Sequence, residues 1–166
     1  SLATIGSDFE LQGSNENKAG GDMTTVEMKA LGSVGGKITV KNLAKLNAVK
    51  FEALTSAGAV LLPTIPYEFE TISLPVLSEV GGDIQFIANT DDTAIGGMTM
   101  NTGVKEIDMN GLTRVDGTVF LTAFAELRTL PALNGVTVKG IELVNLSKVL
   151  DPLDFSGTTF SGGGRL

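Results

Sequence analysis

The chain has 166 residues, of which 42% are hydrophobic and 19% are charged, a composition that indicates one folded domain rather than a disordered chain. The net charge of -7 at pH 7 argues against nucleic acid as a partner, because phosphate binding requires clustered Lys and Arg. Cys and His are both absent, which excludes disulfides, thiolate chemistry and Ser-His-Asp catalysis. We therefore expect no catalytic residue, no metal site and no cofactor.

Residues 1–22 are rich in Ser, Asn, Gly and acidic side chains, and we interpret them as an N-terminal leader and cap. A polar leader ahead of a β-rich domain without Cys is typical of the mature form of an exported bacterial protein. We therefore expect an exported chain at the cell surface or outer membrane. No apolar run approaches the roughly 20 residues of a membrane span. No signal peptide is visible, and a lipoprotein anchor would require a lipobox cysteine upstream of Ser1.

From residue 23 onward the chain repeats one pattern, whose clearest copy runs from Phe69 to Phe86. In each copy five apolar positions are followed by one or two corner residues, mostly glycine, and then by an alternating run of apolar and polar residues. The copies begin 23, 23, 35, 21 and 21 residues apart, at Met23, Leu46, Phe69, Val104, Ala125 and Leu146. The single long step contains residues 89–101, which we interpret as a loop inserted into one copy.

Each copy predicts two β-strands, because apolar residues alternate with polar ones on both sides of the glycines. Glycine suits the corner between the strands since it adopts positive φ without a steric penalty, and Asp116, which replaces one glycine, is also tolerated in that conformation. A single copy would leave its apolar row exposed, so neighbouring copies must stack to bury it. The sequence therefore predicts a mainly β fold: a parallel β-solenoid of about 5–6 coils of 21–23 residues over residues 23–155, with a C-terminal tail at 156–166.

Three segments depart from the pattern. Pro63 stands where the second strand of its copy requires an apolar residue, so we expect that strand to be short. In the fifth copy Arg128 occupies a core position, and Ile141 and Leu143 are one residue out of phase, which indicates a degenerating solenoid or a β-bulge. Residues 43–54 have a helix-like pattern that the repeat phase overrides, and one helical turn at residues 42–45 is compatible with the repeat.

The segments LPVLSEVGGDIQFIANT, MKALGSVGGKITVKN and MNGLTRVDGTVFLTA resemble the repeats of receptor L domains, a right-handed β-helix relative of leucine-rich repeats. The first half of each copy also resembles the bacterial surface-antigen type of leucine-rich repeat. The chain departs from receptor L domains in lacking Cys, and from the surface-antigen type after the glycines. The resemblance covers roughly residues 23–149. It implies a right-handed solenoid and a non-catalytic surface domain that recognises a partner through an exposed sheet, and it supplies no binding residue.

Two surfaces are candidates for partner binding, and neither identifies a ligand. The inserted loop at residues 89–101 carries the acidic pair Asp91 and Asp92, which lacks a calcium motif around it and is interpreted as solvated. The outward residues of the first strands are expected to form a column about 4.8 Å apart in the stack. This column has mixed charge and no aromatic residue, which also suits a solvated sheet face: Glu27, Lys50, Ser73, Asp108 and Thr129.

These observations favour a non-catalytic, exported cell-surface repeat domain that binds a protein or a glycan, with no nucleic-acid partner. One alternative is a carbohydrate-active β-helix enzyme that uses carboxylates, although the acidic residues are scattered along the chain rather than clustered. Another is a purely structural spacer at the surface, in which neither face is used. The glycine corners are not phosphate loops, because no Lys-Ser or Lys-Thr pair follows them.

Overall fold

The computed structural model describes residues 3–13, 23–66, 68–88, 103–146, 149 and 155–161. These residues form thirteen strands and no helix: β1 (Thr4–Ile5), β2 (Phe9–Gln12), β3 (Thr25–Met28), β4 (Ser33–Lys41), β5 (Ala48–Phe51), β6 (Ser56–Ile65), β7 (Thr71–Ser73), β8 (Glu79–Val80), β9 (Ile84–Ala88), β10 (Glu106–Asp108), β11 (Arg114–Thr122), β12 (Thr137–Val144) and β13 (Thr159–Phe160). The fold is therefore mainly β. In residues 42–45, where a helical turn was compatible with the sequence, the chain makes a simple turn between β4 and β5.

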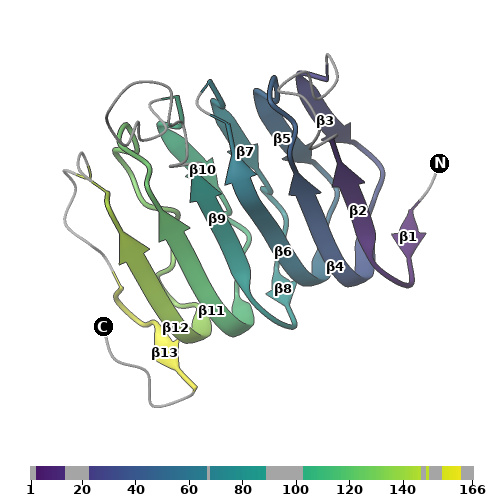
Figure 1. The fold of residues 1–166 in the computed structure, drawn as a ribbon. Helices are drawn as coiled ribbons and strands as arrows, with labels where there is room; N and C mark the ends of the chain where they lie inside the picture. The colour runs from purple at the N-terminus through teal and green to yellow at the C-terminus, as the bar shows by residue number, and fades with distance from the viewer. Residues whose placement is uncertain are drawn as a thin grey trace.

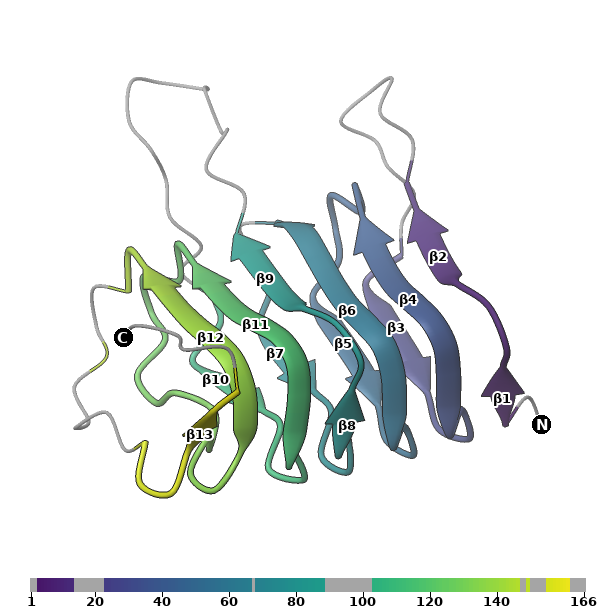
Figure 2. The same cartoon turned by 90° about the horizontal axis from the view of Figure 1, so that it is seen from below.

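The strands form two sheets, each made of parallel strands, and the two sheets lie one behind the other (Figure 1, Figure 2). The nine-stranded sheet has the order β1-β4-β6-β8-β11-β12-β13, with β2 paired to β4 and β9 paired to β6 and β11. The four-stranded sheet has the order β10-β7-β5-β3. Between β3 and β11 the chain passes back and forth between the two sheets, with β8 and β9 following one another in the nine-stranded sheet, and β1, β2, β12 and β13 also belong to that sheet. Every strand pair within the described residues is parallel. This arrangement is consistent with a β-solenoid.

The stacking register follows the repeat predicted from the sequence. The hydroxyls of Thr55 and Ser78 each donate to a carbonyl exactly one repeat earlier, at Gly32 and Thr55, which lie 23 residues away. The hydroxyl of Thr113 makes the same bond to Ser78 across 35 residues, because the inserted segment lies between them. The copies on either side of the insertion therefore stack as neighbours.

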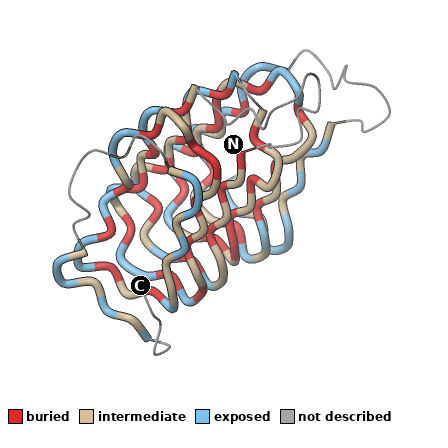
Figure 3. Tube along the Cα trace, turned by 60° about the vertical axis from the view of Figure 1, so that its left-hand side comes forward, coloured by how far each residue is buried: buried red, intermediate tan, exposed pale blue. Residues whose placement is uncertain are grey.

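The core lies between the two sheets and is built from the repeat positions. In the central copy Phe69, Ile72, Leu74 and Leu77 are buried, and the other positions between Phe69 and Leu77 are exposed or half-buried. Buried positions recur from one turn of the chain to the next (Figure 3). Burial of a large aliphatic side chain contributes about 1.5–3 kcal/mol, so five such positions per copy dominate local propensities. Not every repeat position is buried: Met23 in the first copy has 41% of its surface exposed, and Met28 and Leu130 are half-buried.

The glycines of the repeat were expected to form a corner between two strands, but in β4, β6 and β11 they lie within a strand, and of the predicted corners only Gly81 and Gly82 separate two strands, β8 and β9. No described corner glycine has positive φ, and neither has Asp116. Instead, glycines of successive copies stack so closely that a side chain would strike the neighbouring backbone. A Cβ added at Gly58 would lie 2.6 Å from the carbonyl oxygen of Gly36, and one at Gly82 would lie 2.9 Å from that of Gly58. Glycine is required here for close approach of the backbones, not for a left-handed conformation.

The sequence predicted a short strand at Pro63. The strand that contains Pro63, β6, is instead the longest of the described strands, with 10 residues. Pairing of β6 with β4 ends at Leu61, and its pairing with β9 shifts register between Leu62 and Ile65. Pro63 lies in this gap, so its missing N–H removes no ladder bond. The hydroxyl of Thr64 instead accepts a hydrogen bond from the backbone N–H of Asn42 at 2.9 Å.

The predicted phase of the fifth copy is also wrong. Arg128 is exposed rather than in the core, and Leu127 is fully buried in its place. The backbone N–H of Arg128 donates to the carbonyl of Lys105 at 3.2 Å, which aligns Leu127 with Val104 of the preceding copy. The fifth copy therefore begins at Leu127, not at residue 125, and is again 23 residues from its neighbour.

The same copy contains the irregularity that the sequence indicated at Ile141 and Leu143. These residues pair with Val119 and Leu121 of β11, after a register shift between Val115 and Thr118. The shift arises because β11 has two residues at the corner where β12 has one. Of the two explanations left open, the β-bulge is the one that the register shows.

Candidate functional site

The outer face of the four-stranded sheet carries most of the predicted column. Glu27 pairs with Lys50, Lys50 with Ser73, and Ser73 with Asp108 in adjacent strands. Thr129, the fifth predicted member, lies outside any strand, because the fifth copy has the shifted phase described above. Four of the five residues are thus brought together in the expected order.

Alternation along β7 and β10 explains why these side chains face outward. Ile72 and Ile107 are the central residues of the two three-residue strands, and both are buried in the core. Their neighbours must then point to the other face of the sheet. Thr71 and Ser73 on β7 consequently lie beside residues 106 and 108 on β10.

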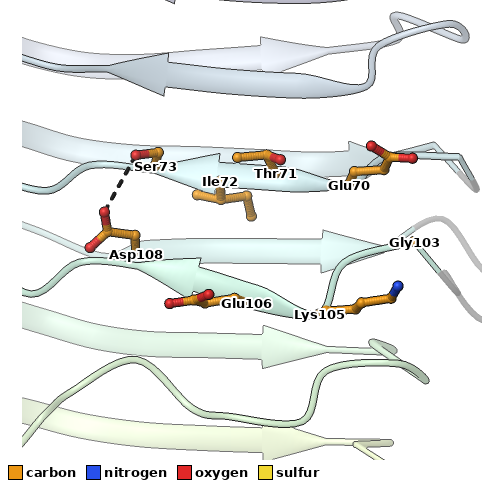
Figure 4. Close-up of a pocket in the computed structure, with 8 residues that line it drawn as sticks. All are labelled: Glu70, Thr71, Ile72, Ser73, Gly103, Lys105, Glu106 and Asp108. Carbon is orange, nitrogen blue, oxygen red and sulfur yellow. Dashed lines mark hydrogen bonds between the residues drawn. The ribbon is translucent and has the colours of Figure 1, made fainter.

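A cavity of about 580 Å³ lies over these two strands. Its lining comes from one segment before the insertion and one directly after it, as drawn in Figure 4: Glu70, Thr71, Ile72, Ser73, Gly103, Lys105, Glu106 and Asp108. Gly103 is the first described residue after the insertion, and a side chain there would collide with the backbone of Phe69, whose carbonyl carbon would be 2.9 Å away. The close approach at Gly103 places Lys105 and Glu106 beside β7.

The lining is polar and carries three carboxylates, one ammonium group and two hydroxyls. Asp108 is held in place from two sides. Its Oδ2 accepts a hydrogen bond from the Ser73 hydroxyl at 3.5 Å, and its Oδ1 accepts one from the backbone N–H of Asn110 at 3.3 Å. Within the described part of the chain, no group of three or more acidic residues is placed to hold a metal ion. The arrangement suits hydrogen bonding to a polar ligand.

A second cavity, of about 620 Å³, follows the stacked glycines on the outer face of the nine-stranded sheet. Asp8 and Asp83 line this cavity. Asp8 directly precedes β2, and Asp83 directly precedes β9. Asp8 Oδ1 accepts a hydrogen bond from the backbone N–H of Lys37 at 2.8 Å, and Asp83 Oδ1 accepts one from that of Thr118 at 2.9 Å. Both amides lie directly after a register shift.

These two aspartates were missed by the sequence analysis, and their roles are structural. Each carboxylate bonds to the amide that follows the two-residue corner of the neighbouring copy. The second oxygen of Asp83 accepts a further bond from the Gln85 side-chain amide at 3.3 Å. The signal in the sequence was an aspartate directly before the second strand, in Ser7-Asp8-Phe9 and Gly82-Asp83-Ile84.

The third acidic residue that lines the second cavity, Asp116, forms an ion pair with Arg114. Its Oδ1 accepts a hydrogen bond from Arg114 Nε at 2.7 Å, and this bond, with the Coulombic attraction of the two charges, raises the pKa of the Arg114 guanidinium above its ordinary value. The pair is exposed and adds little stability.

The inserted loop, residues 89–101, with Asp91 and Asp92, lies outside the described residues. No helix in the described part of the chain has the length and apolarity required to cross a membrane. No protein-family model, curated protein or solved structure matches this chain. The candidate site is therefore defined by its own geometry.

Proposed function

We propose that this chain is a non-catalytic, exported cell-surface repeat domain that binds a glycan or protein partner at the cavity over β7 and β10. The observation that carries the proposal is the juxtaposition of polar side chains from both sides of the insertion, Ser73 with Asp108 foremost. Insertions between stacked repeats commonly lie on the binding face, and Gly103, the first described residue after this insertion, lines the cavity. As part of the same proposal, the fold is a right-handed solenoid of five to six coils similar to receptor L domains.

The chemistry of the lining favours a polar ligand such as a glycan. Carboxylates and hydroxyls can accept and donate hydrogen bonds to sugar hydroxyls. The lining has no aromatic residue and no Arg, the side chains that dominate protein–protein hot spots. A protein partner is therefore the second expectation at this site.

Two features support binding rather than catalysis. Glycoside hydrolysis requires a pair of carboxylates in defined opposition, one of them protonated. Here Asp108 is already bonded to Ser73 and to a backbone amide, and the groove acids Asp8 and Asp83 are bonded to backbone amides of neighbouring copies. These bonds support a structural role for the three aspartates over an acid–base role.

The proposal is tested by a glycan array and a pull-down from cell-surface extract, followed by calorimetry with the ligand found. We expect Glu106→Gln and Ser73→Ala to weaken binding by about tenfold each, the loss of one hydrogen bond to a ligand. Glu27→Gln is the matched control, because Glu27 lies on the same face of the sheet but outside the cavity.

Other results would contradict the proposal in distinct ways. Intact, folded protein that binds nothing in either screen favours the spacer. Shortening of a bound polysaccharide during incubation favours the enzyme. Binding that Glu106→Gln leaves unchanged while Glu27→Gln abolishes it would place the site elsewhere on the sheet. The location at the cell surface is tested separately by the sequence upstream of Ser1, where a lipobox cysteine is expected.

A further inference from the structure

The sequence contains two Asn-Gly pairs, and each lies in a tight turn that leads into a strand of the nine-stranded sheet. Asn110–Gly111 precedes β11, and Asn134–Gly135 precedes β12. In both turns the residue after the glycine donates its N–H to the carbonyl of the residue before the asparagine, at 3.1 Å and 3.2 Å respectively. Each pair therefore occupies the two central positions of a β-turn, and both asparagines are exposed to solvent.

The fold requires glycine at both turns, for different reasons. A Cβ added at Gly111 would lie 2.8 Å from the carbonyl oxygen of Pro75 in the preceding copy. Gly135 has a φ of 76°, a conformation that other residues rarely adopt. In an Asn-Gly pair the main-chain nitrogen after the asparagine is not shielded by a side chain. The fold therefore retains a dipeptide whose asparagine is open to attack by the next backbone nitrogen.

The two turns differ in the hydrogen bonding of that nitrogen. The N–H of Gly135 donates to the carbonyl of Ser156 at 3.0 Å. The N–H of Gly111 has no acceptor within the part of the chain that the structure describes. A hydrogen bond holds both the nitrogen and its proton in place, so it opposes any reaction in which the nitrogen loses the proton and moves.

We propose that Asn110–Gly111 is a site of spontaneous deamidation, and that the same dipeptide at Asn134–Gly135 is protected by its bond to Ser156. Hydroxide removes the proton of the Gly111 nitrogen, which attacks Cγ of the Asn110 side chain. The N–Cγ bond forms, the Cγ–Nδ2 bond breaks, and Nδ2 leaves as ammonia after taking a proton from water. Water then opens the five-membered imide at either carbonyl and leaves aspartate or isoaspartate, with no change of oxidation state.

The position of Asn110 links this reaction to the candidate site. The backbone N–H of Asn110 donates to Oδ1 of Asp108 at 3.3 Å, and Asp108 lines the cavity over β7 and β10. Either product carries a new carboxylate on the residue that bonds to Asp108, and isoaspartate also lengthens the main chain of the turn. Deamidation therefore adds negative charge directly beside the cavity.

The test is incubation of the full, folded chain at mildly alkaline pH, followed by digestion and mass spectrometry of the peptides that contain the two turns. We expect Asn110 to be converted about tenfold faster than Asn134, the factor that corresponds to one backbone hydrogen bond. In urea sufficient to unfold the chain, where both turns lose their structure, the two rates should become equal within about twofold.

Asn110→Gln is the control variant, because Asn110 is exposed and the longer side chain does not readily form the five-membered ring. It should remove the reaction at this turn and leave the rate at Asn134 unchanged. Equal rates at the two turns of the folded chain overturn the proposal, as does faster conversion at Asn134. A difference between the rates that persists in urea also overturns it, because the cause would then lie in the sequence around each pair and not in the fold. None of these measurements requires a ligand, so their outcome is independent of the proposed function.

Discussion

Three residues that end strands of the nine-stranded sheet have positive φ: Asn42, Ala123 and Asn145. They follow β4, β11 and β12 directly, at 57°, 65° and 56° respectively. Asparagine tolerates this region because its short polar side chain bonds locally, whereas a residue such as alanine is disfavoured by about 1–2 kcal/mol. The left-handed residue turns the chain out of the sheet toward the next strand.

This conformation makes a prediction for Asn145, which is exposed, so that packing effects are small. Asn145→Ala should lower the free energy of unfolding by about 1 kcal/mol, and Asn145→Gly should leave it unchanged or raise it slightly. Urea denaturation of the two variants measures the difference. Equal stabilities for the alanine and glycine variants would contradict a left-handed backbone at this position.

At the scale of the elements, β4 and β11 each contain a β-bulge at the glycine position, and an aspartate of the preceding copy bonds to the amide that follows it. Where β11 bulges at Asp116 and Gly117, the amide of Thr118 is bonded by Asp83 of the copy before it. Where β4 bulges at Gly35 and Gly36, Asp8 bonds the amide of Lys37. The carboxylate supplies the acceptor that the disrupted ladder lacks, which links the bulge to the adjacent copy.

Removal of this acceptor should be costly. Asp83→Ala leaves the Thr118 amide without a partner, and we expect a loss of about 1.5–3 kcal/mol in the free energy of unfolding, the range for hydrogen bonds to charged groups. Asp116→Ala is the matched control, because Asp116 makes only an exposed ion pair with Arg114. If the two variants were equally stable in chemical denaturation, the structural role of Asp83 would be refuted.

The strands of the central copies could be predicted because their apolar residues alternate with a constant period. The repeat placed Ile72, Leu74 and Leu77 in the core, and all three are buried. The fifth copy was displaced by two residues because its first strand is replaced by an irregular segment, so Ala125 and Arg128 were assigned to core positions and Leu127 was not. A pattern of apolar residues does not report a local change of spacing.

The candidate site was predictable only in part. The column Lys50, Ser73 and Asp108 follows from the register, which the repeat supplies. The cavity does not, because it depends on Glu70 and Lys105 being adjacent across the inserted segment, and on the approach of Gly103 to the backbone of Phe69. The glycines were expected to turn the chain between two strands through positive φ, but in β4, β6 and β11 they lie within a strand, where the close approach of neighbouring copies requires glycine. A single copy of the repeat does not reveal this backbone proximity.

At the scale of the molecule, the candidate site depends on which residues of each copy face inward. A shift of one residue in any strand exchanges its two faces. The same repeat phase places Leu77 in the core and leaves Val76, beside it in the turn between β7 and β8, at the surface. Leu77 is 0% exposed and Val76 is 44% exposed.

The most direct measurement is thermal denaturation, followed by far-ultraviolet circular dichroism, of Leu77→Asp beside Val76→Asp. Leu77→Asp buries an unpaired charge, at a cost of several kcal/mol against a total stability of about 5–15 kcal/mol, so it should remove the cooperative transition. Val76→Asp, its neighbour in the chain, should keep a melting temperature close to that of the unchanged protein. A Leu77→Asp variant that melts at the original temperature would contradict the register and the candidate site built on it.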